Sequence, residues 1–373
     1  MYGFSPRDTA AGSCGVFLQV HCAVTLRKWL IFSERKMNDI KTADAASLRS
    51  FAGREAACLE EAMRGDLAEV VAGCDPFLAE IIEYALFGGG KRIRPLLAIL
   101  SARMCGEPGN SVYRLAAAFE YLHVATLIHD DVIDNAAERR GRDSVVHRFG
   151  SSAAILAGDW LHARSMHLVG RLAGLDGLEV FCRATGQMVD GEFLQLRYVA
   201  DCSISEEQYF AIIHRKTAML IASTCEIGAI FGGGDGSRRR ALAEYGFKLG
   251  TAFQVVDDLL DYRGETAATG KQTGNDLAEG KLTLPFIRAL ANADERERDL
   301  LAGLITGKPG GERNLAAVSR LIEANDGFIS ARRTAEKLVS EAVAALDIFS
   351  GHGDRESLAM LLALAGYVLG RKK

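Results

Sequence analysis

Residues 109–284 contain no proline, although proline occurs on both sides of this segment. Proline has no backbone N–H and its ring clashes with the preceding helical turn, so helix interiors exclude it more strictly than other structures do. Within the segment, residues 113–134 and 239–261 carry apolar side chains at spacings of three and four, which is the helical period. Alternating patterns typical of strands are scarce. The sequence therefore predicts an all-α fold, built as one large helix bundle.

Glycine-rich segments divide the chain into predicted helices of roughly 12–25 residues, a length that is usual in bundles. These segments lie at 88–90, 106–110, 174–177, 232–236 and 307–311. No change of composition inside residues 37–373 indicates a second domain, so we expect one helical domain over this range. Residues 1–36 show no helical period, and we expect a disordered tail outside the domain. We hypothesise that translation of the native protein begins at Met37.

The composition excludes several classes of protein. A hydrophobic content of 49% with 25% charged residues is that of a globular protein rather than a disordered chain. The net charge of −4 argues against a protein that binds nucleic acid through bulk basicity. Eight cysteines are scattered without a Cys-x-x-Cys pair, which indicates reduced thiols in a cytoplasmic protein rather than a disulfide framework or a zinc site.

The most apolar stretches do not match a transmembrane helix, which needs roughly 18–20 residues without charges. Residues 219–234 include Glu226, and the stretch 358–369 is short and is followed by the basic residues 371–373. We expect both stretches to be buried core helices. The basic C-terminus suggests at most a peripheral membrane contact.

Two Asp-Asp-x-x-Asp motifs lie in predicted helices, at residues 130–134 and 257–261. Residues four apart share a helix face, so each motif projects a pair of carboxylates in one direction. A solvated acidic face is the alternative interpretation, but apolar neighbours surround both motifs and predict burial. Burying three carboxylates without cations would cost several kcal/mol each. The sequence therefore predicts a Mg²⁺ cluster between the motifs, completed by water and substrate phosphates.

A set of basic and polar residues predicts an anion site beside the acids. The glycine-rich turn 88–90 precedes a helix start, with Lys91 and Arg94 one turn apart, and free N–H groups at such a start favour anions. His123 shares a helix face with Asp130, and we expect Gln254 to face the same cavity. The remaining members are Arg139, Arg140, Lys216, Thr217, Lys271 and Lys281. We expect the metals to bind one diphosphate and the basic side chains another.

With these residues assembled, the chain resembles the trans-polyprenyl diphosphate synthases, closest to the long-chain bacterial type that makes octaprenyl or related quinone tails. The resemblance runs from about residue 45 to the C-terminus. Seven motifs in the family's order carry it: GGGKRIRP at 88–95, HVATLIHDDVID at 123–134, ERRGR at 138–142, GDWL at 158–161, KT at 216–217, FQVVDDLLDY at 253–262 and GKQTGNDLAEGKLTLP at 270–285.

The resemblance implies the isoprenoid synthase helix bundle with a central cavity, and a head-to-tail condensation of isopentenyl diphosphate onto an allylic diphosphate. It implies a homodimer and roughly two to three Mg²⁺ ions per active site, held by Asp130, Asp134 and Asp257. The implied catalytic residues are Asp130, Asp131, Asp134, Lys216, Asp257, Asp258 and Asp261. The allylic diphosphate would contact Arg139, Lys216, Thr217, Gln254 and Lys271, and isopentenyl diphosphate would contact Lys91, Arg94, His123 and Arg140. Lys281 is a further implied substrate-binding residue.

The resemblance also suggests a long product. Family members that stop early place bulky aromatic residues four or five positions before the first Asp, where this chain has Thr126 and Ala125. Leu122, Phe119 and Ala118 lie one to two turns further back along the same helix. The helix from Thr126 to Ala118 is about 12 Å long, which is room for at least two more isoprene units. We therefore expect a product of about C30–C50.

Three alternatives remain open at this stage. A non-catalytic subunit of a heteromeric prenyl synthase would typically lose one Asp motif or its basic partners, and this chain keeps both. A terpene cyclase or head-to-head synthase would carry an altered second motif and would lack GGGKRIRP. A short-chain synthase that stops at C15 or C20 would keep every motif and differ only in the tunnel.

Overall fold

The computed structural model describes residues 45–106, 109–263, 274–306, 315–351 and 353–371. The predicted tail 1–36, Lys271 and the last two lysines lie outside the described residues. In the described ranges the prediction of an all-α bundle is confirmed. The helices are α2 (Ala45–Val71), α3 (Pro76–Leu86), α4 (Ile93–Cys105), α5 (Val112–Ile133), α6 (Val145–Phe149), α7 (Ser151–Arg197), α8 (Glu206–Ile213), α9 (Met219–Phe231), α10 (Gly236–Arg263), α12 (Asn275–Glu279), α13 (Leu284–Asn292), α14 (Glu295–Thr306), α15 (Leu315–Ala324), α16 (Gly327–Ala345) and α17 (Arg355–Gly370).

Two short elements depart from regular α-helix. The π-helix η1 (His214–Ala218) joins α8 to α9, and the 3-10 helix η2 (Leu346–Phe349) follows α16. One hairpin of two-residue strands, β1 (Glu138–Arg139) and β2 (Arg142–Asp143), follows α5 in an antiparallel register. The sequence did not predict this hairpin, which contains the ERRGR motif.

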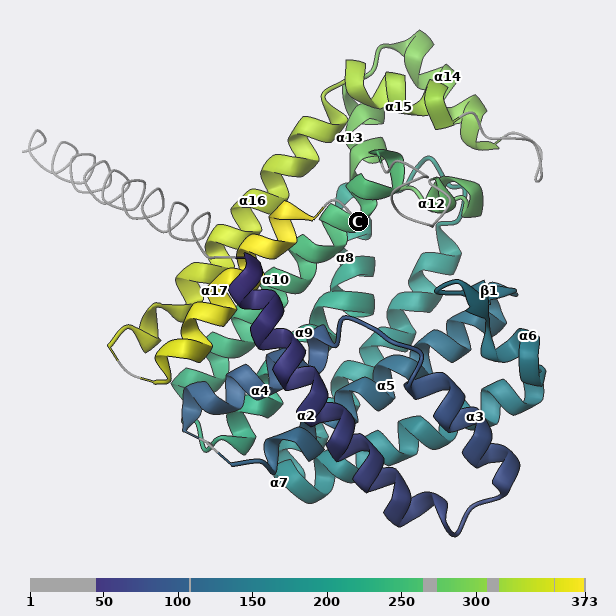
Figure 1. Cartoon of the computed structure of the whole chain (residues 1–373). Coiled ribbons are helices and arrows are strands. Elements are labelled where there is room, and N and C mark those ends of the chain that lie inside the picture. The colour runs from purple at the N-terminus through teal and green to yellow at the C-terminus, as the bar shows by residue number, and fades with distance from the viewer. Residues whose placement is uncertain (1–44, 107–108, 264–273, 307–314, 352, 372–373) are drawn as a thin grey trace, which may run out of the picture. The chain divides into compact units, whose positions relative to one another are not determined.

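The bundle is arranged around α9, which packs against α4, α7 and α10 (Figure 1). Apart from Glu226, α9 itself consists of apolar and small residues on all its faces. Such a helix is stable only when it is buried. α5 packs against α7, α4 and α2, and its residues Ala116–Phe119 are fully buried. Of the two helices that carry the Asp motifs, α5 belongs to the hydrophobic core that also includes residues of α9, and α10 packs against α9 and α16.

Glycines predicted to break helices do so in most cases. α4 begins after the turn 88–90, and α9 ends at Gly232. The segment α7 spans 47 residues, but it consists of two helices that meet at a kink inside the predicted break at 174–177. Its direction changes at Gly174, whose φ of 67° and ψ of −164° suit a residue without a side chain. The helical parts 151–173 and 175–197 each fall within the predicted length of 12–25 residues, so the predicted break is confirmed.

The two apolar stretches predicted to be core helices are buried. They correspond to α9 and to most of α17, and each places its leucine, isoleucine or alanine residues in the core. Within the described ranges, no helix combines the length and the apolar character needed to cross a bilayer.

α4 and α9 approach closely at Gly228, where a Cβ atom would lie 2.5 Å from the Ala98 carbonyl oxygen. We predict that Gly228→Ala lowers the free energy of unfolding by about 1–3 kcal/mol, because the two helices must separate or the backbone must shift. Urea unfolding followed by circular dichroism measures the change.

Gly186→Ala is the matched control. Gly186 is exposed in α7, and nothing lies within 4 Å of the position that a Cβ atom would take there. This substitution should raise stability by roughly 0.5–1 kcal/mol, since alanine favours helix. Equal stability changes for the two variants would contradict the close-packing interpretation of Gly228.

Candidate active site

The first Asp motif lies at the end of α5. One of its three acids is bound by an arginine, and the other two remain available to bind other groups. Asp131 is only 2% exposed and accepts hydrogen bonds from the Arg139 Nε, at 2.7 and 2.8 Å from its two oxygens. Asp130 is half-buried, and Asp134 is the exposed C-cap of α5. The hairpin that follows α5 brings Arg139 back onto Asp131. Asp130 and Asp134, four residues apart, keep their carboxylates for other partners.

In the second motif, Asp258 is buried and bound on both oxygens. It accepts hydrogen bonds from the Tyr209 hydroxyl at 2.5 Å and from the Gln254 amide at 2.9 Å. Burial, followed by the charge of Asp276, raises the pKa of the Asp258 carboxyl well above its usual range, and the two hydrogen bonds oppose this rise. The predicted inward position of Gln254, four residues before Asp258, is confirmed.

The other two acids of the second motif have different partners. Asp257 pairs with Arg371 at 2.6 Å, and the Arg371 side chain is 8% exposed and lies over the Phe253 ring at 4.0 Å. Asp261 accepts the backbone N–H groups of residues 275 and 276 at 3.2 and 3.0 Å, which are the first N–H groups of α12. Arg371 therefore lies in the site. It is one of the three basic residues at 371–373, but it does not form part of a basic outer surface.

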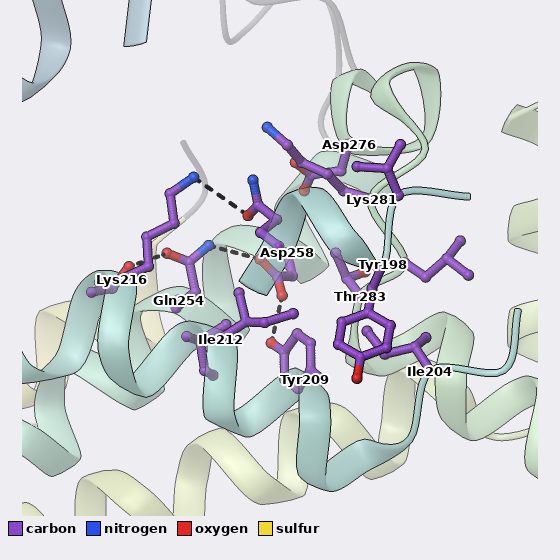
Figure 2. Close-up of a pocket in the computed structure, with 15 residues that line it drawn as sticks. Tyr198, Ile204, Tyr209, Ile212, Lys216, Gln254, Asp258, Asp276, Lys281 and Thr283 are labelled. Atoms are coloured by element: carbon purple, nitrogen blue, oxygen red, sulfur yellow. Dashed lines mark hydrogen bonds between the residues drawn. The ribbon is translucent and has the colours of Figure 1, made fainter. Parts of the chain in front are cut away.

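A chain of hydrogen bonds connects η1 to Asp258 (Figure 2). Thr217 donates to the Gln254 oxygen at 3.1 Å, and the Gln254 nitrogen donates to Asp258. Beside it, Lys216 forms an ion pair with Glu192 and donates to the Gln195 oxygen at 3.4 Å. All these residues except Glu192 line a pocket, together with Tyr198, Ile204, Tyr209, Ile212, Ile213, Asp276, Lys281 and Thr283.

The electrostatics of the site favour cations beside the acids. Burial raises the pKa of Asp130, Lys216 opposes this effect, and Glu192 adds to it. Partial burial raises the pKa of Asp134 in the same way, and Lys281 opposes it. No three acidic, histidine or cysteine side chains of the described part converge as a complete metal site. Such a set of separate carboxylates suits Mg²⁺, which takes few protein ligands and completes its shell with water and phosphate.

The predicted anion site lies at the start of α4. The Arg94 Nη1 is 3.2 Å from the His123 Nδ1, and Arg140 donates to the carbonyl of Gly89 in the glycine turn. Burial and then the charge of Arg94 lower the pKa of His123 well below its usual range, so the ring is neutral and accepts from Arg94. Lys91 is exposed beside this turn, 5.8 Å from the Tyr367 ring.

Several residues of the site were not predicted from the sequence. The polar pair Glu192 and Gln195, three apart on α7, is a detectable signal, because both should face the same direction. Tyr209 and Arg371 gave no signal, since each reaches its Asp only through tertiary packing. Asp276 lies within the motif at 270–285, where no role was predicted for it, and it lines the pocket.

Asp276 provides a pH test of the site. Burial, together with Asp261, raises its pKa to about 7. A carboxyl whose pKa is higher in the folded protein contributes stability that is fully present near pH 4 and is lost as the pH rises through 7. Asp276→Asn should therefore gain stability over the native protein between about pH 4 and 7, on the order of a few kcal/mol, and level off above.

Urea unfolding in EDTA across this pH range measures the effect of Asp276→Asn. Asp299→Asn, which removes an exposed carboxyl on α14, serves as the surface control. A difference between Asp276→Asn and the native protein that stays constant from pH 4 to pH 8 would contradict the assignment.

Comparisons with known proteins agree with this geometry. Residues 75–322 match the polyprenyl synthetase family. Octaprenyl diphosphate synthase of Haemophilus influenzae is 38% identical over 78% of this chain and 88% of its own length. A short chain isoprenyl diphosphate synthase of Methanothermobacter thermautotrophicus is 36% identical over 78% of this chain and 89% of its own length.

A solved structure of a Caulobacter crescentus polyprenyl synthase, complexed with calcium and isoprenyl diphosphate, has a TM-score of 0.79 and 32% identity. The alignment covers 88% of this chain and 98% of that one. Sequence relatives, fold and site therefore agree that the chain belongs to the polyprenyl synthetase family and is a prenyl diphosphate synthase, a prenyltransferase.

Proposed function

We propose that this enzyme adds isopentenyl diphosphate units head-to-tail to an allylic diphosphate, such as farnesyl diphosphate, to make an all-trans product of about C30–C50 for a quinone side chain. The observation that carries the proposal is the position of both Asp motifs beside a cationic set within one bundle. Arg94 interacts electrostatically with Asp130 of the first motif and with Asp257 of the second. The octaprenyl relative supports the long product.

We assign Asp130, Asp134 and Asp257 as the residues that hold Mg²⁺, roughly two to three ions. Their fit rests on a donor set of hard carboxylate oxygens: Asp130 and Asp134 lie four residues apart and burial disfavours their charge, and Asp257 would exchange its ion pair with Arg371 for the metal. The Caulobacter neighbour, complexed with calcium and isoprenyl diphosphate, supports a divalent cation here. Bound Mg²⁺ would neutralise the charge that develops on the leaving diphosphate.

Asp131 and Asp258, two of the three remaining acids, act as positioning residues for the cations and amides around the allylic diphosphate. Asp131 holds Arg139 through two short hydrogen bonds, and Asp258 orients Gln254, which in turn holds Thr217. Lys216 supplies positive charge at the leaving group, where it stabilises the developing anion. Lys281 lines the same pocket. Lys271 keeps its predicted role here, although it lies outside the described residues.

Isopentenyl diphosphate would bind the anion site at the start of α4, through Lys91, Arg94, His123 and Arg140. The allylic cation must meet the alkene rather than water, and apolar side chains such as Ile212 and Ile213 line the adjoining pocket. We assign the final proton to the departing diphosphate and name no side-chain base. Asp261 shapes the site indirectly, by holding the start of α12.

The growing product would extend along α5, away from the metals. Ala125 is buried and small, and the Thr126 hydroxyl is bound to the His123 carbonyl at 2.8 Å, so neither side chain closes this direction with an aromatic ring. Leu122, Phe119 and Ala118 are fully buried in the core further along the helix. We propose that Leu122 and Phe119 contribute to the end of the product channel.

Product analysis tests the long-chain proposal. Purified enzyme with Mg²⁺, farnesyl diphosphate and excess isopentenyl diphosphate should give a ladder that ends at about C30–C50 by mass spectrometry. Thr126→Phe should stop the ladder near C20, because a close-packed ring at this position would block the channel before the part that runs from Thr126 to Ala118. EDTA should abolish turnover in both proteins, and added Mg²⁺ should restore it.

The short-chain alternative makes the opposite prediction. A native product of C15 or C20 would keep the reaction and discard the channel along α5, as the Methanothermobacter relative allows. Phe119→Ala is the companion variant, and it should lengthen the product of a long-chain enzyme. A folded protein with no condensation at all would indicate a non-catalytic subunit instead.

We further propose that the enzyme is a homodimer that pairs through α7. This helix exposes an apolar stripe at Val189, Phe193 and Leu196, whose spacing of four and three places them on one face. Phe193 is 68% exposed, and Leu156, nearer the start of α7, is 66% exposed. Contiguous exposed apolar surface of this kind is characteristic of an interface, and two-fold pairing makes the patch cover itself.

Phe193→Glu tests the dimer. A charge buried at the centre of the interface should weaken pairing, and light scattering coupled to size exclusion should show a monomer at micromolar concentration. Leu300→Glu, a comparable change at an exposed leucine of α14, should leave the dimer intact. A native protein that elutes as a monomer would refute the proposal.

A further inference from the structure

The start of α4 contains a residue with an unfavourable backbone conformation. Arg92, the N-cap of α4, has φ 50° and ψ 35°, which is the left-handed region. A residue with a Cβ atom pays about 1–2 kcal/mol for this conformation, and such positions persist only where neighbouring contacts hold them. Arg92 belongs to the GGGKRIRP motif, but it is not one of the residues proposed to bind either substrate.

Two bonds hold Arg92 in place. Its Nη2 donates to the Leu86 carbonyl at 2.7 Å, at the end of α3, and its Nη1 donates to Glu120 in the middle of α5. The side chain is 9% exposed, so the ion pair is buried. Arg92 thereby connects α3 and α5 across the turn 88–91 that carries the predicted anion site.

The buried position of the Glu120 carboxylate is energetically unfavourable. It is 1% exposed on a helix face that is otherwise apolar, and its second oxygen, Oε2, has no hydrogen-bond partner among the described residues. A buried ion pair with unsatisfied lone pairs is often less stable than an apolar pair of the same volume. Packing alone therefore does not account for an acid here.

The surroundings of Glu120 are cationic. Burial lowers the pKa of the Arg94 guanidinium, and among the acids that oppose this effect Glu120 acts most strongly. Glu120 is also the neighbouring charge that acts most strongly on Arg140, and it favours the charged form. Arg92 and Arg139 repel Arg140. The Nε of Arg94 is shielded from solvent and has no partner in the described part of the chain. One acid thus offsets the repulsion among the arginines gathered at this turn.

We propose that Glu120 is a positioning residue for isopentenyl diphosphate: it holds Arg92, and through Arg92 the turn 88–91, so that Lys91 and Arg94 converge on one diphosphate. This inference rests on the proposed assignment of that site to isopentenyl diphosphate. Glu120 does not touch the substrate, because its own negative charge would repel the phosphates. Glu120 favours binding of isopentenyl diphosphate by positioning the turn, whereas its negative charge by itself would disfavour that binding.

This opposition gives a sharp test. Glu120→Gln removes a negative charge from an anion site, so charge alone predicts tighter binding of isopentenyl diphosphate. Positioning predicts the reverse: a KM for isopentenyl diphosphate raised about tenfold, with the KM for farnesyl diphosphate unchanged and kcat lowered less. Calorimetry with isopentenyl diphosphate should show the same loss of affinity directly.

Arg92→Gly supplies an independent second variant. Glycine accepts a positive φ without strain, so this change keeps the backbone conformation and removes only the two bonds. It should raise the same KM by a similar factor, and the double variant should be no worse than either single one, because both act through one interaction. Additive losses in the double variant would overturn the proposal.

Glu55→Gln is the matched control. Glu55 is another buried acid, bound by Arg103 at 3.0 Å and by the Tyr113 hydroxyl at 3.0 Å, between α2, α4 and α5. It should lower Tm and leave both KM values unchanged. An unchanged or lower KM for isopentenyl diphosphate in Glu120→Gln overturns the positioning role. An unchanged KM in Lys91→Ala overturns the site assignment instead, so the two failures are distinguishable.

Discussion

The site depends on carboxylates that the fold, with the exception of the exposed Asp134, wholly or partly removes from water. Both Asp motifs end long helices whose other residues form the core, so α5 and α10 cannot release their acids to solvent without losing packing. Desolvated carboxylates need partners. The protein supplies a guanidinium to Asp131, a phenol and an amide to Asp258, and helical N–H groups to Asp261. Each such pairing also fixes a second side chain, and in this way the acids organise the whole cavity.

In the proposed anion site the buried groups are cations, and they likewise need partners, here of negative or neutral accepting character. Arginines gathered near the start of α4 repel one another, and burial of a guanidinium is unfavourable unless an acceptor compensates it. His123 accepts from Arg94 because it is neutral in this setting. Glu120 compensates the cluster from the core side and leaves the solvent side to a ligand. The acidic and basic halves of the site are therefore each pre-arranged by partners of opposite character.

Much of this could be predicted from residues on one helix. The absence of proline over 109–284 indicated helices, and the bundle followed. The helical period correctly placed Gln254 against Asp258 and His123 on the side of the site, since positions four or seven apart share a face. The hairpin at 138–143 was not predicted, because two-residue strands are too short to show a pattern. The break predicted at 174–177 is confirmed as a kink at Gly174, whose non-helical φ and ψ separate the two helices of α7.

The sequence by itself determined the helical class, the two acid pairs, the cationic motifs and the family to which they belong. Only the tertiary structure decided how the six acids of the Asp motifs differ, since Tyr209 meets Asp258 across 49 sequence positions. It likewise decided the pairing of Arg92 with Glu120, across 28 positions. The helical period specifies neighbours along one helix. Which helices face each other depends on how all the side chains of the core pack together, and one-dimensional patterns do not contain that information.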